Sequence, residues 1–275
     1  MNFYTNITQW GNFLLLREVV NGERINRRVK YSPTLFMPVM KPTEWKTLEG
    51  KYVTPIKHQT IKEAKEWIEN YKDQPHMVYG NNLFSYNFLS EQFPKRVEWD
   101  IDNILIVTID IEVACENGFP DVEASQEEML CITIKDLATG KFITWGTREA
   151  NVESEYRVFW TEQEMLTDFH KWWCENTPDI ITGWNCNLYD IPYICRRLER
   201  VLGDKWQKSL SPWNKVNMRE VYIQGRRNLA YDILGVSILD YLDLYRKFTY
   251  TNQESYALNH IAFVELGQQK NENPY

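Results

Sequence analysis

The chain has 275 residues, 43% hydrophobic and 25% charged, which suits one large domain or two of ordinary size and excludes a disordered tail. Its formal net charge of −7 argues against a wholly basic nucleic-acid-binding coat but allows a local basic groove around an acidic metal site. No apolar run approaches the roughly 20 residues that cross a bilayer, and the first residues do not resemble a secretion signal. We therefore expect a protein that is neither membrane-embedded nor secreted.

The cysteines and histidines argue against a structural zinc site. The five cysteines include no Cys-x-x-Cys pair, and the four histidines are scattered along the chain. We expect free thiols, as in a protein of the reducing cytosol. Aromatic residues make up 14% of the chain, and their default use is core packing, with base stacking as the alternative.

The first part of the chain predicts a smaller mixed α+β domain over residues 1–100. An Asn21-Gly22 turn between segments 13–16 and 28–31, in a part of the chain with β-like alternation, is typical of a β-hairpin. Thr60 followed by Glu63 indicates a helix start, and the apolar residues after it recur at three- and four-residue spacings along one helical face. These residues are Ala64, Trp67, Ile68 and Tyr71.

The second part, residues 101–275, predicts an α/β layer structure. Residues 104–113 are apolar on both faces and rich in β-branched side chains, which favours a strand in the middle of a covered sheet. Two more strands, a helix, a strand and a helix follow, an order typical of an α/β domain. In chain order they are 129–135, 142–147, a helix after Thr161, 179–184 and 190–202. Beyond them we expect a long hairpin over 216–238 and helices over 239–248 and 256–266.

Two carboxylates stand out in the strand over 104–113. Asp110 and Glu112 are two residues apart, so both side chains point to the same side of the strand. Ionised carboxylates in such a strand repel each other, and a divalent metal relieves that repulsion through hard oxygen ligands. A solvated strand face is the alternative interpretation of the same pattern, and the apolar surroundings favour the metal.

A third carboxylate follows a later strand end. Asp190 stands at the start of a predicted helix, a few residues after Gly183 and Asn185. An aspartate at a helix start often caps the helix, and it can equally face a metal. The pattern leaves both interpretations open.

These motifs resemble the exonuclease region of the family B DNA polymerases. Thr108-Ile-Asp110-Ile-Glu112 is similar to the first exonuclease motif, and Asn185-x-x-x-Tyr189-Asp190-Ile-Pro192 to the second. Further segments resemble the replicative polymerases of T-even-type bacteriophages. They are Gly118-Phe119-Pro120, Ser211-Pro212 and the stretch 235–245. The resemblance covers nearly the whole chain.

The resemblance implies a ribonuclease-H-like exonuclease domain over 101–275 that removes mismatched 3′-terminal nucleotides of DNA with two divalent metals, Mg²⁺ or Mn²⁺. Asp110 and Glu112 would bind the metal that activates water, and Asp190 the second metal or its water. Asn185 would orient the terminal nucleotide, and Phe119 would wedge against its bases. Taken without the resemblance, Asn185 suits a turn and Phe119 a core. A phage protein would act in the host cytoplasm.

The resemblance also implies a fourth carboxylate in a Tyr-x-x-x-Asp motif. Between Asp240 and Tyr275 no tyrosine is followed four residues later by aspartate. We interpret Asp240 and Asp243 as structural residues that cap or pair at a helix. We therefore expect an amino-terminal piece of a polymerase, or one subunit of a polymerase encoded as two chains. Alone it would not polymerise, and its nuclease activity would be weak or absent.

Two basic segments suggest nucleic-acid contacts. The hairpin over 216–238 carries Arg219, Arg226 and Arg227 among tyrosines, and in the family the corresponding hairpin helps to separate primer from template. A solvated edge hairpin protected by charge is the alternative. The basic stretch 24–30 suits RNA contact, so a non-catalytic DNA- or RNA-binding module is the competing function.

Overall fold

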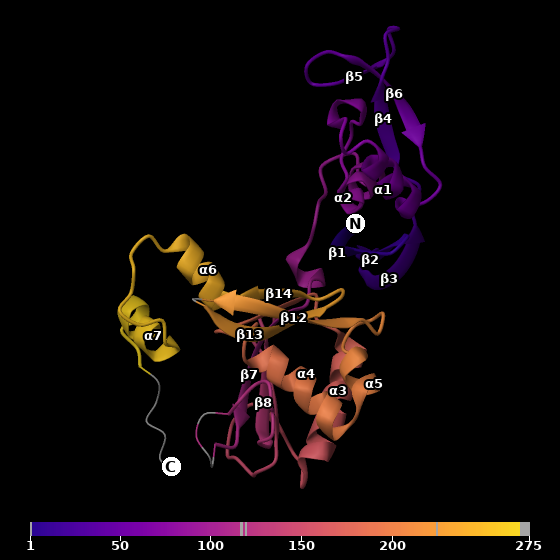
Figure 1. Ribbon diagram of the computed structural model, residues 1–275. Coiled ribbons are helices and arrows are strands. Elements are labelled where there is room, and N and C mark those ends of the chain that lie inside the picture. The colour runs from indigo at the N-terminus through magenta and orange to yellow at the C-terminus, as the bar shows by residue number, and fades with distance from the viewer. Residues whose placement is uncertain (1, 116–117, 119, 224, 270–275) are drawn as a thin grey trace. The chain divides into compact units, whose positions relative to one another are not determined.

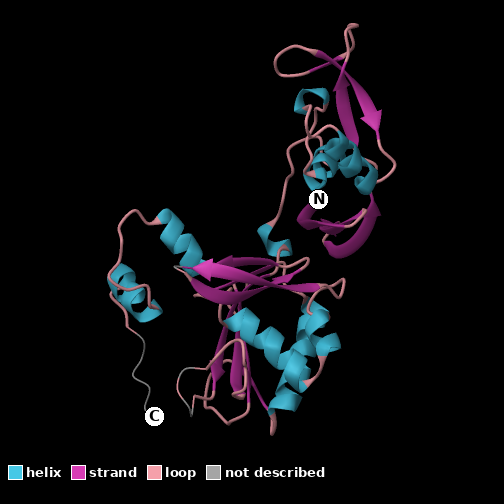
Figure 2. Cartoon of the chain, viewed as in Figure 1, coloured by secondary structure: helices cyan, strands magenta, loops and turns pink. Residues whose placement is uncertain are grey.

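The computed structural model describes residues 2–115, 118, 120–223 and 225–269. The chain forms two compact units, Met1–Asn103 and Ile104–Tyr275, and both mix helices and strands (Figures 1 and 2). Each sheet and each of the two apolar cores belongs wholly to one unit. Within the described ranges, no helix combines the length and the apolar character needed to cross a bilayer.

The first unit opens with a three-stranded antiparallel sheet of order β1-β2-β3. Its strands are β1 (Asn2–Trp10), β2 (Phe13–Val20) and β3 (Glu23–Lys30). β2 and β3 form the predicted hairpin, and Asn21 and Gly22 both take the positive φ that such a tight turn requires. β1 was not predicted, because its polar residues and a bulge near Tyr4 obscure the apolar alternation.

A second small sheet and two helices complete this unit. The sheet has the order β4-β6-β5, with β4 (Thr34–Pro38), β5 (Trp45–Lys46) and β6 (Tyr52–Lys57). The helices are α1 (Ile61–Asn70) and α2 (Phe84–Gln92), with short 3₁₀ turns at Pro75–Met77 and Ile101–Asn103. α1 begins as predicted, because the Thr60 hydroxyl accepts a hydrogen bond from the backbone N–H of Glu63 at 3.1 Å.

The second unit is built on a six-stranded mixed sheet of order β10-β9-β8-β7-β11-β14. Its strands are β7 (Ile106–Val113), β8 (Met129–Asp136), β9 (Phe142–Gly146), β10 (Glu155–Val158), β11 (Ile180–Gly183) and β14 (Ser237–Asp240). Only β8 runs opposite to the others, and β7 lies between β8 and β11. This mixed sheet fits the ribonuclease-H-like fold that the resemblance implied.

Helices cover one face of this sheet and enclose its core. α3 (Glu162–Asn176) packs on β8 and β9, while α4 (Asp190–Val201) packs on β7 and against α5 (Asp204–Lys208). Figure 1 shows these three helices beside β7 and β8. The Thr161 hydroxyl caps α3 as predicted, accepting from the Glu164 N–H at 3.2 Å. A hairpin of β12 (Val216–Ile223) and β13 (Arg226–Ile233) follows, then α6 (Tyr241–Phe248) and α7 (Leu258–Leu266).

The predicted hairpin over 216–238 is too long at its carboxyl end. β13 ends at Ile233, Gly235 turns the chain with a φ of +95°, and Ser237–Asp240 joins the central sheet as β14, parallel to β11. Residue Leu239 therefore belongs to a strand and not to the following helix. The apolar run 236–239 is ambiguous in the sequence because its partner strand lies more than fifty residues away.

Candidate active site

β7 presents its carboxylates on one face of the central sheet. The side chains that alternate with them are buried, namely those of Val107, Ile109 and Ile111. Asp110 and Glu112 are exposed. The prediction that both faces of this strand are covered is therefore wrong at these positions within the described chain, although the strand does lie inside the sheet. The two carboxylates share a side, as the alternation predicts.

Asp190 reaches this strand from the start of α4. It is the first residue of the helix, and Tyr189, the residue before it, occupies the cap position, so Asp190 is not the helix cap. Its side chain is buried, with 4% of the residue exposed, and one carboxylate oxygen accepts a hydrogen bond from the Ile111 N–H at 3.1 Å. The second motif is thus joined to the first at the residue between Asp110 and Glu112.

Burial and charge act together on the Asp190 carboxyl group. Burial, together with the negative charge of Asp110, raises its pKa to about 7, although hydrogen bonds from backbone N–H groups oppose the rise. The effect of Asp110 shows that the two carboxylates are electrostatic neighbours. A cation beside them would relieve this repulsion.

A buried aspartate holds the turn that leads into α4. Asp240 is 5% exposed, and its carboxylate accepts hydrogen bonds from three backbone N–H groups. The donors are Asn185 at 3.0 Å, Asn187 at 2.9 Å and Leu242 at 2.9 Å. Asp240 therefore caps α6 and fixes the turn in which Asn185 takes a φ of +63°. The prediction that Asp240 caps a helix is confirmed. Its hydrogen bonds to the distant turn at Asn185 and Asn187 are a role that the sequence did not reveal.

The donor set suits a hard divalent cation. Burial, with smaller contributions from Tyr193 and from the charges of Asp190 and Glu112, raises the pKa of the Tyr189 phenol to about 12. Oxygen ligands of this kind are those that Mg²⁺ and Mn²⁺ prefer. In the part of the chain that the structure describes, however, no three His, Cys, Asp or Glu side chains are gathered closely enough to hold a metal ion.

The predicted DNA-contacting residues have different surroundings. Arg227 forms ion pairs with Glu123 and Glu220, each at 2.8 Å, so its charge is already compensated within the protein. Arg226 is exposed at the start of β13. Asn185 lies in the turn held by Asp240, and Phe119 lies outside the described residues.

Arg219 shares the ion-paired state of Arg227. Its side chain contacts both carboxylate oxygens of Asp232, at 3.0 and 3.1 Å, on the neighbouring strand of the hairpin. A charged edge of this kind also protects a hairpin from pairing with other strands. Both interpretations of the hairpin therefore remain compatible with its structure.

Comparison with known proteins shows that the chain is similar to DNA polymerases of phages and herpesviruses. Residues 58–261 match the family model of the DNA polymerase family B exonuclease domain. The chain is 30% identical to the DNA-directed DNA polymerases of Escherichia phage RB69 and Enterobacteria phage T4, over 99% of its own length and 34% and 33% of theirs. It is 25% identical to the DNA polymerase catalytic subunit of Alcelaphine herpesvirus 1, over 66% of this chain and 18% of that subunit. The chain thus spans about a third of the length of the phage polymerases.

Proposed function

The chain belongs to the family B DNA polymerases, in their exonuclease region, and on that premise we propose that it performs 3′-to-5′ proofreading on single-stranded 3′ ends of DNA. The observation that carries the proposal is the hydrogen bond from the Ile111 N–H to Asp190. It joins the second carboxylate motif to the strand that carries Asp110 and Glu112. This bond brings together two residues that are 79 positions apart in the chain.

Each carboxylate has a proposed role. Asp110 and Glu112 hold one divalent cation, Mg²⁺ or Mn²⁺, and Asp190 holds the second or its water. When bound, such a pair supplies an activated water and stabilises the leaving 3′ oxygen. Asp190 is poised by its burial, because a neighbouring cation favours the ionised form that the protein alone disfavours.

Four further residues are proposed to contact DNA. Asn185 orients the terminal nucleotide, Phe119 wedges against its bases, and Arg226 and Arg227 contact the phosphates from the hairpin. The exposure of Arg226 supports the last role better than the ion-paired state of Arg227 does.

The proposal extends to the setting of the chain. Residues 1–100 serve as the amino-terminal domain of the polymerase and 101–275 as an exonuclease domain that lacks its third motif. The remaining polymerase domains, or a second subunit, complete the acidic site, and the protein acts in the host cytoplasm. The relatives are polymerases with about three times the length of this chain, which supports such a division.

Digestion of 5′-labelled single-stranded DNA with Mg²⁺ or Mn²⁺ tests this function. We expect weak digestion by the chain alone, a strong increase when a polypeptide extending through a Tyr-x-x-x-Asp segment is used, and loss of digestion in Asp190→Ala of that extended protein. The added helix supplies the missing carboxylate of the metal pair. Equal activity of the short and extended proteins would instead assign the fourth ligand to Asp240 or Asp243 and overturn their structural interpretation.

The competing function is non-catalytic binding of DNA or RNA. β3 favours it, since most of this strand is exposed and it carries the basic stretch 24–30. Part of that charge is already used, because Arg27 pairs with Glu18 and Arg28 lies over the Phe13 ring at 3.6 Å. Metal-independent binding without digestion, unchanged in the extended protein, would favour this alternative.

A further inference from the structure

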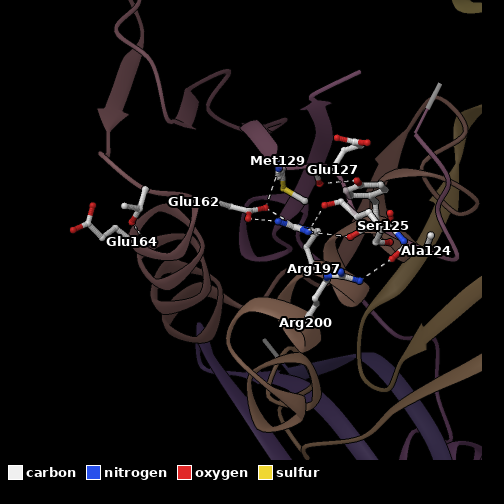
Figure 3. A network of polar contacts seen from close by, with 11 residues as sticks. Ala124, Ser125, Glu127, Met129, Glu162, Glu164, Arg197 and Arg200 are labelled. Atoms are coloured by element: carbon white, nitrogen blue, oxygen red, sulfur yellow. Dashed lines mark hydrogen bonds and ion pairs between the residues drawn. The ribbon is translucent and has the colours of Figure 1, made fainter. Parts of the chain in front are cut away.

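One face of α4 carries a row of hydrogen-bond donors. Tyr193, Arg196, Arg197 and Arg200 follow one another at the spacing i, i+3, i+4, i+7, so they share a face of the helix. We name these four residues the α4 stripe. The stripe contacts the connection between β7 and β8, and Figure 3 shows Arg197 and Arg200 directed at that connection.

The stripe donates to five successive backbone carbonyl groups, those of residues 123–127. Arg196 bonds Glu123 at 2.6 Å, Arg200 bonds Ala124 at 3.3 Å, Arg197 bonds Ser125 at 2.9 Å and Gln126 at 3.0 Å, and Tyr193 bonds Glu127 at 2.8 Å. This segment belongs to no strand or helix, so its carbonyl groups lack the partners that a sheet ladder would give. Side chains of α4 supply them instead.

A buried ion pair lies at the centre of the stripe. Arg197 and Glu162 are each 5% exposed, and the guanidinium contacts both oxygens of the carboxylate. Glu162 is the first residue of α3, and it also accepts a hydrogen bond from the Met129 N–H at 2.9 Å. Met129 opens β8 and pairs with Val113 of β7. This one pair therefore joins the starts of α3 and β8 to the middle of α4.

The helix α4 connects the buried ion pair to Asp190. Asp190 stands seven residues before Arg197 on the same helix, a rise of about 10 Å along a rigid element. Buried ion pairs add little net stability, but they fix geometry when every donor and acceptor is satisfied. A shift of α4 at Arg197 would move Asp190 away from the Ile111 N–H.

We infer that the α4 stripe, centred on Arg197, is the positioning device that sets where Asp190 lies relative to Asp110 and Glu112. The inference rests on the proposed function for the meaning of that site. Arg197 is thus a positioning residue that acts through Asp190 and takes no part in the chemistry itself.

Amide hydrogen exchange at Ile111 in the full chain tests the inference without any metal. Arg197→Lys keeps a positive charge beside Glu162 but loses the planar fork that bonds a carboxylate and two carbonyl groups at once. We expect the Ile111 N–H to exchange about tenfold faster in Arg197→Lys, because its bond to Asp190 opens more often. Mn²⁺ affinity, measured by electron paramagnetic resonance, should weaken about tenfold in the same variant.

Two control variants separate positioning from general stability. Phe169→Leu disturbs the core beneath α3 and serves as the control for a general loss of stability, measured as the fall in melting temperature relative to Arg197→Lys. Arg157→Lys removes a guanidinium fork at the far edge of the sheet and serves as the control for the arginine-to-lysine change itself. Ile111 exchange that rises no more in Arg197→Lys than in Phe169→Leu would overturn the positioning role. Separately, Mn²⁺ affinity that is unchanged in Asp110→Asn would overturn the proposed metal site, whatever the exchange result.

Discussion

The carboxyl group of Asp190 couples the stability of the protein to pH. Burial, aided by the charge of Asp110, raises its pKa from the ordinary 3.8 to about 7. Between those two values the folded chain holds a proton that the unfolded chain has released. The metal-free protein therefore loses stability as pH rises from about 4 to about 7, and the loss is complete above that range.

Replacing Asp190 by asparagine should remove this loss, because the amide stays neutral at every pH. In chelator we expect Asp190→Asn to be more stable than the parent by about 2–4 kcal/mol near pH 8, with the difference fading toward about pH 4. Urea unfolding at several pH values measures the effect. A stability difference that does not change over that range would contradict a carboxyl group with a raised pKa at this position.

Gly183 is required by the close approach of β11 to β7. A Cβ atom at this residue would lie 2.8 Å from the Ile109 carbonyl oxygen and 2.9 Å from the Cβ of Cys186. Because a backbone atom cannot move aside cheaply, we expect Gly183→Ala to destabilise the protein by about 1–3 kcal/mol. Thermal unfolding of the variant measures the loss.

Gly146 offers the matched control in the same sheet. A Cβ atom there would meet the hydroxyl end of the Tyr156 side chain, which can rotate away at the loss of its hydrogen bond to the Arg148 carbonyl. Gly146→Ala should therefore cost less than Gly183→Ala. Equal losses would show that backbone crowding at β11 is not the cause.

At the scale of elements, the β12–β13 hairpin distinguishes two arginines that the sequence treats alike. Both are exposed, but the charge of Arg227 is compensated by ion pairs with Glu123 and Glu220. If the hairpin contacts DNA, Arg226→Ala should lower affinity for single-stranded DNA and reduce the salt slope by about 1, and Arg227→Ala should change both less. Fluorescence anisotropy across a salt series checks this. A larger effect of Arg227 would mean that DNA displaces its glutamate partners.

The cap of α3 can be tested in the same way. The helix begins at Glu162, which belongs to the buried ion pair, and Thr161 caps it. Thr161→Ala removes the hydroxyl that caps the helix and should cost about 1 kcal/mol of unfolding free energy. Thr167→Ala is the control, since that hydroxyl only bonds back to the Gln163 carbonyl within the helix. A cost in the control as large as in Thr161→Ala would reject the cap as the cause.

At the scale of the whole molecule, each of the two units contains its own sheets and its own apolar core. The six-stranded sheet and the apolar cluster around it lie entirely within Ile104–Tyr275. We therefore expect a polypeptide of residues 104–275 to fold alone, with the near-ultraviolet circular dichroism of packed tryptophans such as Trp145 and Trp173. An aggregated or molten polypeptide would show that the second unit depends on the first.

Local signals predicted much of this architecture, and distant pairings account for what was missed. The starts of α1 and α3 follow from Thr60 and Thr161, since a cap and its helix are adjacent in sequence. β14 was missed because its identity depends on pairing with β11, which no local pattern encodes. The short edge strand β10 was missed for the same reason.

The candidate site shows the same division between local and distant information. Strand alternation predicted that Asp110 and Glu112 share a side, and their apolar surroundings favoured a metal, but the exonuclease chemistry came from the family resemblance alone. The hydrogen bond from the Asn185 N–H to the Asp240 carboxylate joins residues 55 positions apart, and no local sequence pattern predicts it. The helical spacing of the α4 stripe is visible in the sequence, but its partners are backbone carbonyl groups about seventy positions earlier.

Anomalous diffraction from crystals soaked with Mn²⁺ tests the central claim most directly, because it locates the cation without relying on activity. The account predicts a manganese peak bounded by the carboxylates of Asp110, Glu112 and Asp190, and its loss in crystals of Asp110→Asn. A peak that lies elsewhere, or one that persists beside Asp190 in that variant with unchanged strength, would contradict the assignment of these three residues to one metal-binding site.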